Sequence, residues 1–206
     1  MSDSLRRIYN SIDSLFDRNS ITEDLHFTKD DVQSSSSKTA LQAFEKVYVF
    51  VREIDKQASL KMIVSQQGID LEGKSTYWEF FFDLTSKRAQ LVCAWKLLWD
   101  EKLDNFKNAV IEFKVTPFPP VNSPLRQMLK DGKMLNQQLA SMWKQEMKRR
   151  LNLSNPFRDT NLIVKEFTQQ GLDISQTEFS LSTKQVNDKT YWVAQTRDKT
   201  YSTEFV

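Results

Sequence analysis

The chain has 206 residues, 39% of them hydrophobic and 27% charged, so it can bury a core in one large domain or in two small ones. Its 29 basic and 27 acidic residues give a net charge of +2, which is too balanced to imply an overall attraction to nucleic acid or to membranes. The single cysteine, Cys93, excludes an intramolecular disulfide framework and an all-cysteine zinc site.

Residues 1–37 are predicted to form a helix followed by a polar linker. Apolar residues at helical spacing indicate an amphipathic helix over 2–18, and residues 19–37 are polar and end in four serines. Asp3 and the lack of a long apolar run argue against a secretory signal. No window approaches the apolar length of a membrane span. We therefore expect no membrane span and a cytoplasmic location, with an organelle lumen left open.

Residues 38–120 predict a first unit that combines one helix with a sheet. The helix is expected over 39–67, and Gly68 suits the left-handed residue that closes a helix. The apolar period then changes to two, which is typical of strands. Three such runs predict an antiparallel meander that ends at Pro117, namely 76–84, 89–99 and 109–115.

Residues 121–206 predict a long helix and then a second unit of the same kind. The long helix is expected over 124–151. A shorter helix starts at Asn155 and Pro156, which suit a cap and a first turn, and it ends near Gly171. Three strand-like runs complete the chain, at 177–186, 190–197 and 200–206.

Two short sequences occur twice in the chain. Gln66-Gln67-Gly68-Ile69-Asp70-Leu71 returns as a close variant at 169–174, and Thr76-Tyr77-Trp78 returns at 190–192. The shared order suggests an internal duplication, and coincidence is the alternative. We therefore predict an α+β fold of two related helix-plus-antiparallel-sheet units, with extra N-terminal and central helices.

This layout resembles the cystatin-like and PepSY-like classes of small α+β modules. The residues that carry the resemblance are the helix that ends at Gln67, the meander over 76–115 and the shorter version over 157–206. The resemblance implies binding or inhibition of other proteins. The missing secretory signal and the helix at 124–151 depart from that plan.

The sequence offers no catalytic, metal or cofactor motif. The only histidine, His26, lies in a polar stretch, and Cys93 lies between apolar neighbours, where cysteine commonly serves as a small hydrophobic residue. Four glycines are too scattered for a phosphate-binding loop. We therefore expect no catalytic residues, no metal ligands and no cofactor, and leave open whether the protein is an enzyme.

One feature of the meander points to a partner. It is apolar on both faces, because Phe81 and Val92 point opposite to Phe80 and Leu91, so the second unit or a partner should cover the additional face. The expected function is a non-catalytic protein-binding, assembly or regulatory factor that acts through an aromatic sheet or helix surface.

Two alternatives accompany this function: a nucleic-acid-associated factor that uses the basic cluster at 144–150, and an enzyme of unknown class built on acids and tyrosines. Trp78, Trp95 and Trp99 have apolar neighbours that favour the core. The candidate partner-binding residues are Trp99, Phe118, Trp143, Lys148, Arg149 and Arg150.

Overall fold

The computed structural model describes residues 25–31, 35–66, 68–84, 89–117, 157–174, 179–187 and 189–206. The helices predicted over 2–18 and 124–151 lie outside the described residues.

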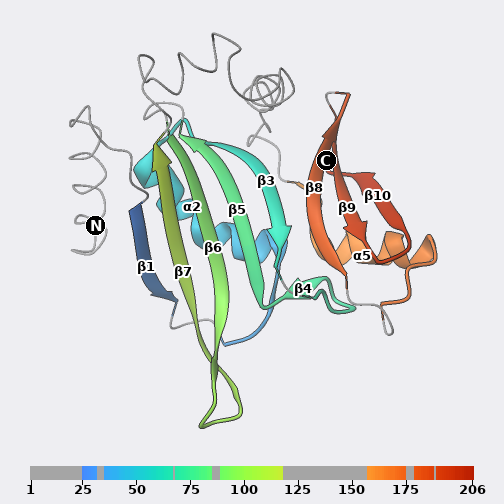
Figure 1. Cartoon of the computed structure of the whole chain (residues 1–206), viewed down its shortest axis with the longest axis horizontal. Helices are drawn as coiled ribbons and strands as arrows, with labels where there is room; N and C mark the ends of the chain where they lie inside the picture. The colour runs from blue at the N-terminus through green and yellow to red at the C-terminus, as the bar shows by residue number, and fades with distance from the viewer. Residues whose placement is uncertain are drawn as a thin grey trace, which may run out of the picture.

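One eight-stranded sheet dominates the described part of the chain (Figure 1), and its strand order is β1-β7-β6-β5-β3-β8-β9-β10. All neighbouring strands run antiparallel. The strands are β1 (Leu25–Asp31), β3 (Ser59–Ser65), β5 (Tyr77–Leu84), β6 (Ala89–Asp100), β7 (Asn105–Pro117), β8 (Ser180–Val186), β9 (Lys189–Gln195) and β10 (Thr200–Glu204).

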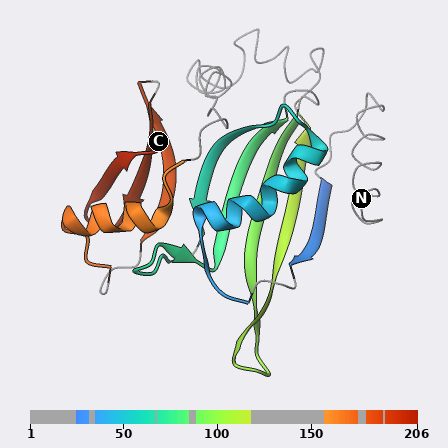
Figure 2. The ribbon, with the colours of Figure 1, turned by 180° about the vertical axis from the view of Figure 1, so that it is seen from behind.

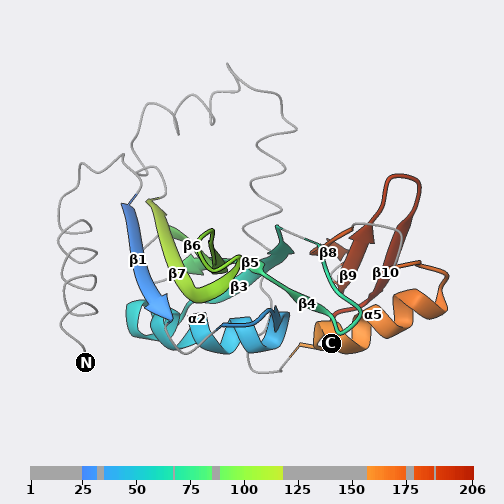
Figure 3. The same cartoon turned by 90° about the horizontal axis from the view of Figure 1, so that it is seen from below.

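Both described helices lie on the same side of this sheet (Figures 2 and 3). Helix α2 (Ala40–Ile54) crosses the larger half of the sheet, and helix α5 (Thr160–Gln169) lies under β8, β9 and β10. A separate two-stranded sheet joins β2 (Lys38–Thr39) to β4 (Lys74–Ser75).

The predicted α+β fold of separate helix-plus-sheet units is wrong, because the structure is mainly β and one sheet runs through both parts of the chain. We call β1 to β7 with α2 the first half, and α5 with β8, β9 and β10 the second half. Part of the error is the helix expected over 39–67. Helix α2 ends at Ile54, where Asp55 adopts an extended conformation with φ −149° and ψ 113°, and residues 59–65 form β3 instead. The apolar residues of this strand fit a helical stripe as well as a strand, so the period alone did not separate the two.

The predicted linker over 19–37 also contains a strand. Residues 25–31 form β1, which pairs with β7 along its whole length. A polar strand at the edge of a sheet needs little apolar alternation, which explains why the sequence pattern missed it. In contrast, the six runs predicted as strands are confirmed, with ends shifted by a few residues.

The core lies between the sheet and the two helices. Each half buries one tryptophan that is bonded in the same way: the Trp78 Nε1–H donates to the Lys38 carbonyl (2.7 Å), and the Trp192 Nε1–H donates to the Arg158 carbonyl (3.0 Å). Each carbonyl belongs to the residue just before the N-cap of α2 or α5. The two halves therefore share one contact between strand and helix, and the predicted duplication itself stays a prediction.

Strands β3 and β8 join the two halves through side-chain hydroxyls. On either side of their one paired position, the Ile63 N–H donates to Thr183 Oγ1 (3.0 Å) and the Leu181 N–H donates to Ser65 Oγ (2.8 Å). Because both bonds are buried, each hydroxyl satisfies a backbone donor that water cannot reach.

The N-termini of α2 and α5 also meet and share their caps. The Asp159 Oδ1 accepts from the Leu41 N–H (3.0 Å) and from the Thr160 N–H (2.8 Å). The Thr160 hydroxyl accepts from the Ala40 N–H (3.1 Å) and donates to the Gly73 carbonyl (2.5 Å). Helix N-termini present unpaired N–H groups, so Asp159, the N-cap of α5, and Thr160, its first residue, satisfy donors of both helices.

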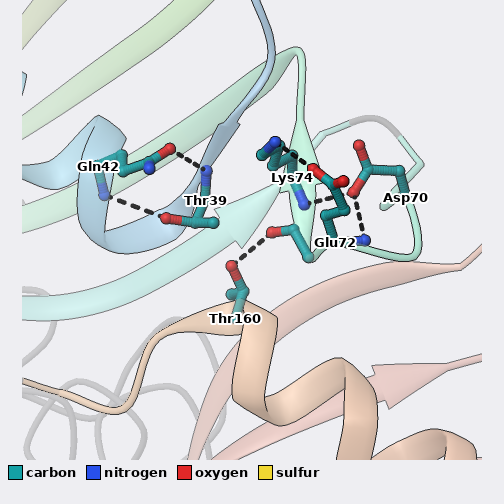
Figure 4. A network of polar contacts seen from close by, with 7 residues as sticks. Thr39, Gln42, Asp70, Glu72, Lys74 and Thr160 are labelled. Carbon is teal, nitrogen blue, oxygen red and sulfur yellow. Dashed lines mark hydrogen bonds and ion pairs between the residues drawn. The ribbon is translucent and has the colours of Figure 1, made fainter.

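Local bonds shape the chain on both sides of this junction (Figure 4). Thr39 and Gln42 form a capping box at the start of α2. In the turn before β4, the Asp70 Oδ1 accepts from the backbone N–H groups of Glu72 (2.9 Å) and Lys74 (2.8 Å). This turn fixes the Gly73 carbonyl where the Thr160 hydroxyl reaches it.

Candidate functional site

The β6–β7 hairpin extends well beyond the rest of the sheet (Figures 1 and 2). Its end carries exposed apolar side chains. We call residues 98–106 the hairpin tip. Within it, Leu98 is 42% exposed, Trp99 53% and Leu103 62%. The other described tryptophans are all 0% exposed, so Trp99 stands out as a large apolar group left in solvent.

Trp99 is exposed because this end of the β6–β7 hairpin extends past the rest of the sheet (Figure 2). Its position in β6 has the same parity as Trp95 and Leu97, which face the helices and are buried. No described helix covers that side of the hairpin at its projecting end (Figure 2). The expected burial of Trp99 in the core is therefore wrong, whereas Trp78 and Trp95 are buried as predicted.

The hairpin tip holds its aromatic groups in a defined arrangement. The rings of Trp99 and Phe106 meet edge to face, with centroids 5.0 Å apart. A register shift between β6 and β7 lies beside Trp99, and such bulges commonly redirect side chains. The turn is fixed by the Lys102 N–H, which donates to Asp100 Oδ1 (3.0 Å), and by Asp104 in the left-handed region at φ 47°.

The charges around this apolar group are mainly acidic. Glu101 and Asp104 are exposed in the turn, beside the exposed Lys102. An apolar centre bordered by carboxylates is suited to a partner surface that is apolar with a basic rim.

A second feature is the sheet face opposite the helices, which we call the open face. Its apolar residues Phe81 and Val92 are half-buried and paired across β5 and β6. The described strands β8, β9 and β10 do not cover them, because they extend the sheet sideways instead.

Polar residues on the open face form a bonded network. The Tyr77 hydroxyl donates to Glu79 Oε1 (3.0 Å), the Gln66 amide bonds the other oxygen of that carboxylate, and Lys96 pairs with Glu112 (2.6 Å). Burial, followed by the charge of Glu79, raises the pKa of Tyr77 to about 12. Tyr77 is therefore a protonated hydrogen-bond donor at neutral pH.

This network bears on the enzyme alternative, which expects two acids close together. Glu79 and Glu112 both lie opposite Ala94, on the strands either side of it, and so share the open face. Each carboxylate already has a partner, Glu79 in Tyr77 and Glu112 in Lys96. The arrangement is that of a satisfied structural network rather than a poised acid–base pair.

The cysteine, the histidine and the acidic side chains are the remaining candidates for a catalytic or metal site. Cys93 is buried, and burial raises the pKa of its thiol well above the usual range, as suits a core residue. His26 lies in β1 rather than in a loop. No group of three or more histidine, cysteine or acidic side chains in the described ranges could hold a metal ion. Among the described helices, neither is long and apolar enough to span a membrane.

Of the candidate partner-binding residues, the structure places only Trp99. The others, Phe118, Trp143, Lys148, Arg149 and Arg150, lie outside the described residues, as does the whole basic cluster. Sequence reasoning missed Leu103 and Phe106 at the hairpin tip. Leu103 could have pointed to this site from the sequence, because it is an apolar residue within the turn-like stretch 100–105. A side chain in such a turn has no core to pack against.

No protein-family model, curated protein or solved structure matches this chain. The resemblance to cystatin-like and PepSY-like modules therefore stays a prediction.

Proposed function

We propose that this chain is a non-catalytic binding or assembly protein that docks a protein partner with its hairpin tip, in the cytosol or an equivalent compartment. The observation that supports the proposal is Trp99, which is 53% exposed and packs edge to face on Phe106 at the tip of a projecting hairpin. The same tip also exposes Leu98 and Leu103. Exposed contiguous apolar groups usually mark interaction sites, and tryptophan is enriched among the residues that dominate binding.

The partner of this tip is a protein rather than a lipid surface. Cell membranes carry a negative surface potential on their cytoplasmic leaflet, which attracts basic segments. Within the tip the carboxylates of Asp100, Glu101 and Asp104 outnumber the one lysine, Lys102, so an anionic membrane would not attract it. A protein surface with an apolar pocket and a basic rim fits both the charge and the shape of the tip.

The magnitude of the effect follows from the position of Trp99. An aromatic anchor at the centre of an interface commonly contributes about 2 kcal/mol or more, so its truncation should weaken binding roughly 30-fold. The carboxylates lie at the rim, and their neutralisation should mainly slow association at low salt.

The test compares two double variants in a quantitative pull-down from the native host. Trp99→Ala with Leu103→Ser removes the apolar tip, and Val49→Ser with Val186→Ser removes apolar groups that are 59% and 46% exposed elsewhere. We expect the tip variant to lose the specific partner and the control variant to keep it. Circular dichroism confirms that both are folded. Full retention of every partner by the tip variant would reject the proposal.

A further inference from the structure

The edge of the large sheet at β10 carries backbone groups that no described strand pairs. The strand order ends at β10, which pairs only with β9. The Phe205 N–H donates to the Thr190 carbonyl (3.0 Å), and such bonds involve every second residue of an antiparallel ladder. The N–H and carbonyl groups of Thr200 and Ser202 and the N–H of Glu204 therefore point away from β9, toward the free edge. The Glu204 carbonyl also lies at this edge, where it accepts from the Arg158 Nη1–H (3.4 Å).

β10 has few of the devices that commonly protect an edge strand. It contains one charged residue, Glu204, and no proline, and its pairing with β9 shows no register shift. The opposite edge differs, because β1 ends in Lys29, Asp30 and Asp31. Of the two edges, β10 is the one suited to accept another strand.

Two exposed apolar side chains accompany this edge. Leu162 of α5 is 48% exposed, and Val206, just after β10, is 63% exposed. Leu162 lies one helical turn before Glu166, whose carboxylate accepts from the Thr203 hydroxyl of β10 (2.5 Å). Leu162 therefore lies on the side of α5 nearest β10, so the open backbone edge and exposed apolar groups occur together.

We propose that β10 pairs with β10 of a second copy of this chain, antiparallel and about a two-fold axis at Ser202. In this register Ser202 faces its own counterpart and Thr200 faces Glu204, so the outward backbone groups of the two copies meet. Lys199 then faces Phe205, so no like charges lie directly opposite each other. The join continues one sheet through both copies and places the two Leu162 side chains on the same side of it.

The self-opposed position of Ser202 gives a sharp test. Ser202→Lys and Ser202→Glu each place two like charges opposite each other on the two-fold axis, whereas a mixture of the two variants places lysine opposite glutamate. Sedimentation velocity should show a dimer for the unmodified chain, at least tenfold weaker dimerisation for each variant alone, and recovery in the equimolar mixture. Gln57→Lys and Gln57→Glu, at an exposed turn after α2, are matched controls that should change nothing.

A second readout does not depend on charge. Paired residues of this kind have Cα atoms about 5.5 Å apart, within the range that a disulfide spans. The only native cysteine, Cys93, is buried, so Ser202→Cys supplies the accessible thiol. Under an added copper–phenanthroline oxidant this variant should form a covalent dimer, and Gln57→Cys should not.

Three results would overturn the proposal. The first is a monomer at every concentration reached, with no covalent dimer from Ser202→Cys. The second is a dimer that neither charge variant weakens, which would place the contact elsewhere. The third is a monomer whose cellular partner is lost in Ser202→Pro, because that result would assign the edge to a strand of a different protein.

Discussion

Replacing Thr160 with valine tests how the two halves of the protein are joined. Its hydroxyl accepts a hydrogen bond from Ala40 at the start of α2 and donates one to Gly73 before β4. Thr160 is 0% exposed, so water does not replace the missing hydroxyl. Valine has nearly the same shape, and the change therefore isolates the two hydrogen bonds from packing.

The cost follows from the groups left behind. Valine leaves the Ala40 N–H and the Gly73 carbonyl buried without a partner, and each such group costs about 1–3 kcal/mol. The expected loss is therefore about 2–6 kcal/mol, a large share of the 5–15 kcal/mol that typically stabilises a folded protein. For a chain of this size, the midpoint of thermal unfolding should fall by roughly 5–20 °C.

The assay is urea denaturation followed by circular dichroism, with Thr160→Ser as the matched control. Serine keeps the hydroxyl and loses one methyl group, at a cost of about 1 kcal/mol. We expect the valine variant to be clearly less stable than the serine variant. Equal stability of the two variants would refute the hydrogen-bonded junction between α2 and α5.

Three further predictions concern stability. Gly73→Ala should destabilise the fold by about 1–3 kcal/mol in urea titrations, because Gly73 has φ +76° and a Cβ there would overlap the backbone of α5 at Thr160; a neutral result would contradict this packing. Thr183→Val should cost about 1–3 kcal/mol in the same assay by leaving the Ile63 N–H unpaired, and Thr183→Ser should not. Tyr77 has a pKa raised from 10.0 to about 12, so the unfolded chain releases its proton first and stability should fall from pH 10 to 12; Tyr77→Phe should reduce this slope in pH-dependent unfolding, and an unchanged slope would count against the raised pKa.

The sequence predicted those elements whose pattern is local. Strands such as β5 alternate buried and half-buried residues without a break, as in Trp78, Phe80 and Phe82 against Tyr77 and Phe81, so their period of two is clear. The short helix α5 was also predicted, although it begins at Thr160 rather than near Asn155.

The predictions were wrong where contacts between distant parts of the chain determine the structure. β3 carries apolar residues that fit a helical stripe, and only its pairing with β5 and β8 makes it a strand. The continuous sheet could not be predicted, because it depends on hydroxyl bonds such as that from Ile63 to Thr183, between residues 120 positions apart. The duplication stays a prediction, with which the matching bonds of Trp78 and Trp192 agree.

At the candidate site, too, part could be predicted from the sequence and part depends on tertiary structure. Trp99 could be named from sequence as an aromatic candidate, but its exposure depends on how far the β6–β7 hairpin extends past the helices. Leu103 and Phe106 reach the same tip only because the register of β6 and β7 brings them there.

The most direct test of the central claim is site-specific photo-crosslinking in the native host. A photoreactive phenylalanine analogue replaces Trp99 at the hairpin tip, and the same analogue replaces Val49, which is 59% exposed on α2, as the control. Docking of a protein partner by the tip predicts one discrete protein adduct from position 99 that is absent from position 49. The same adducts from both positions, or none from position 99, would contradict it.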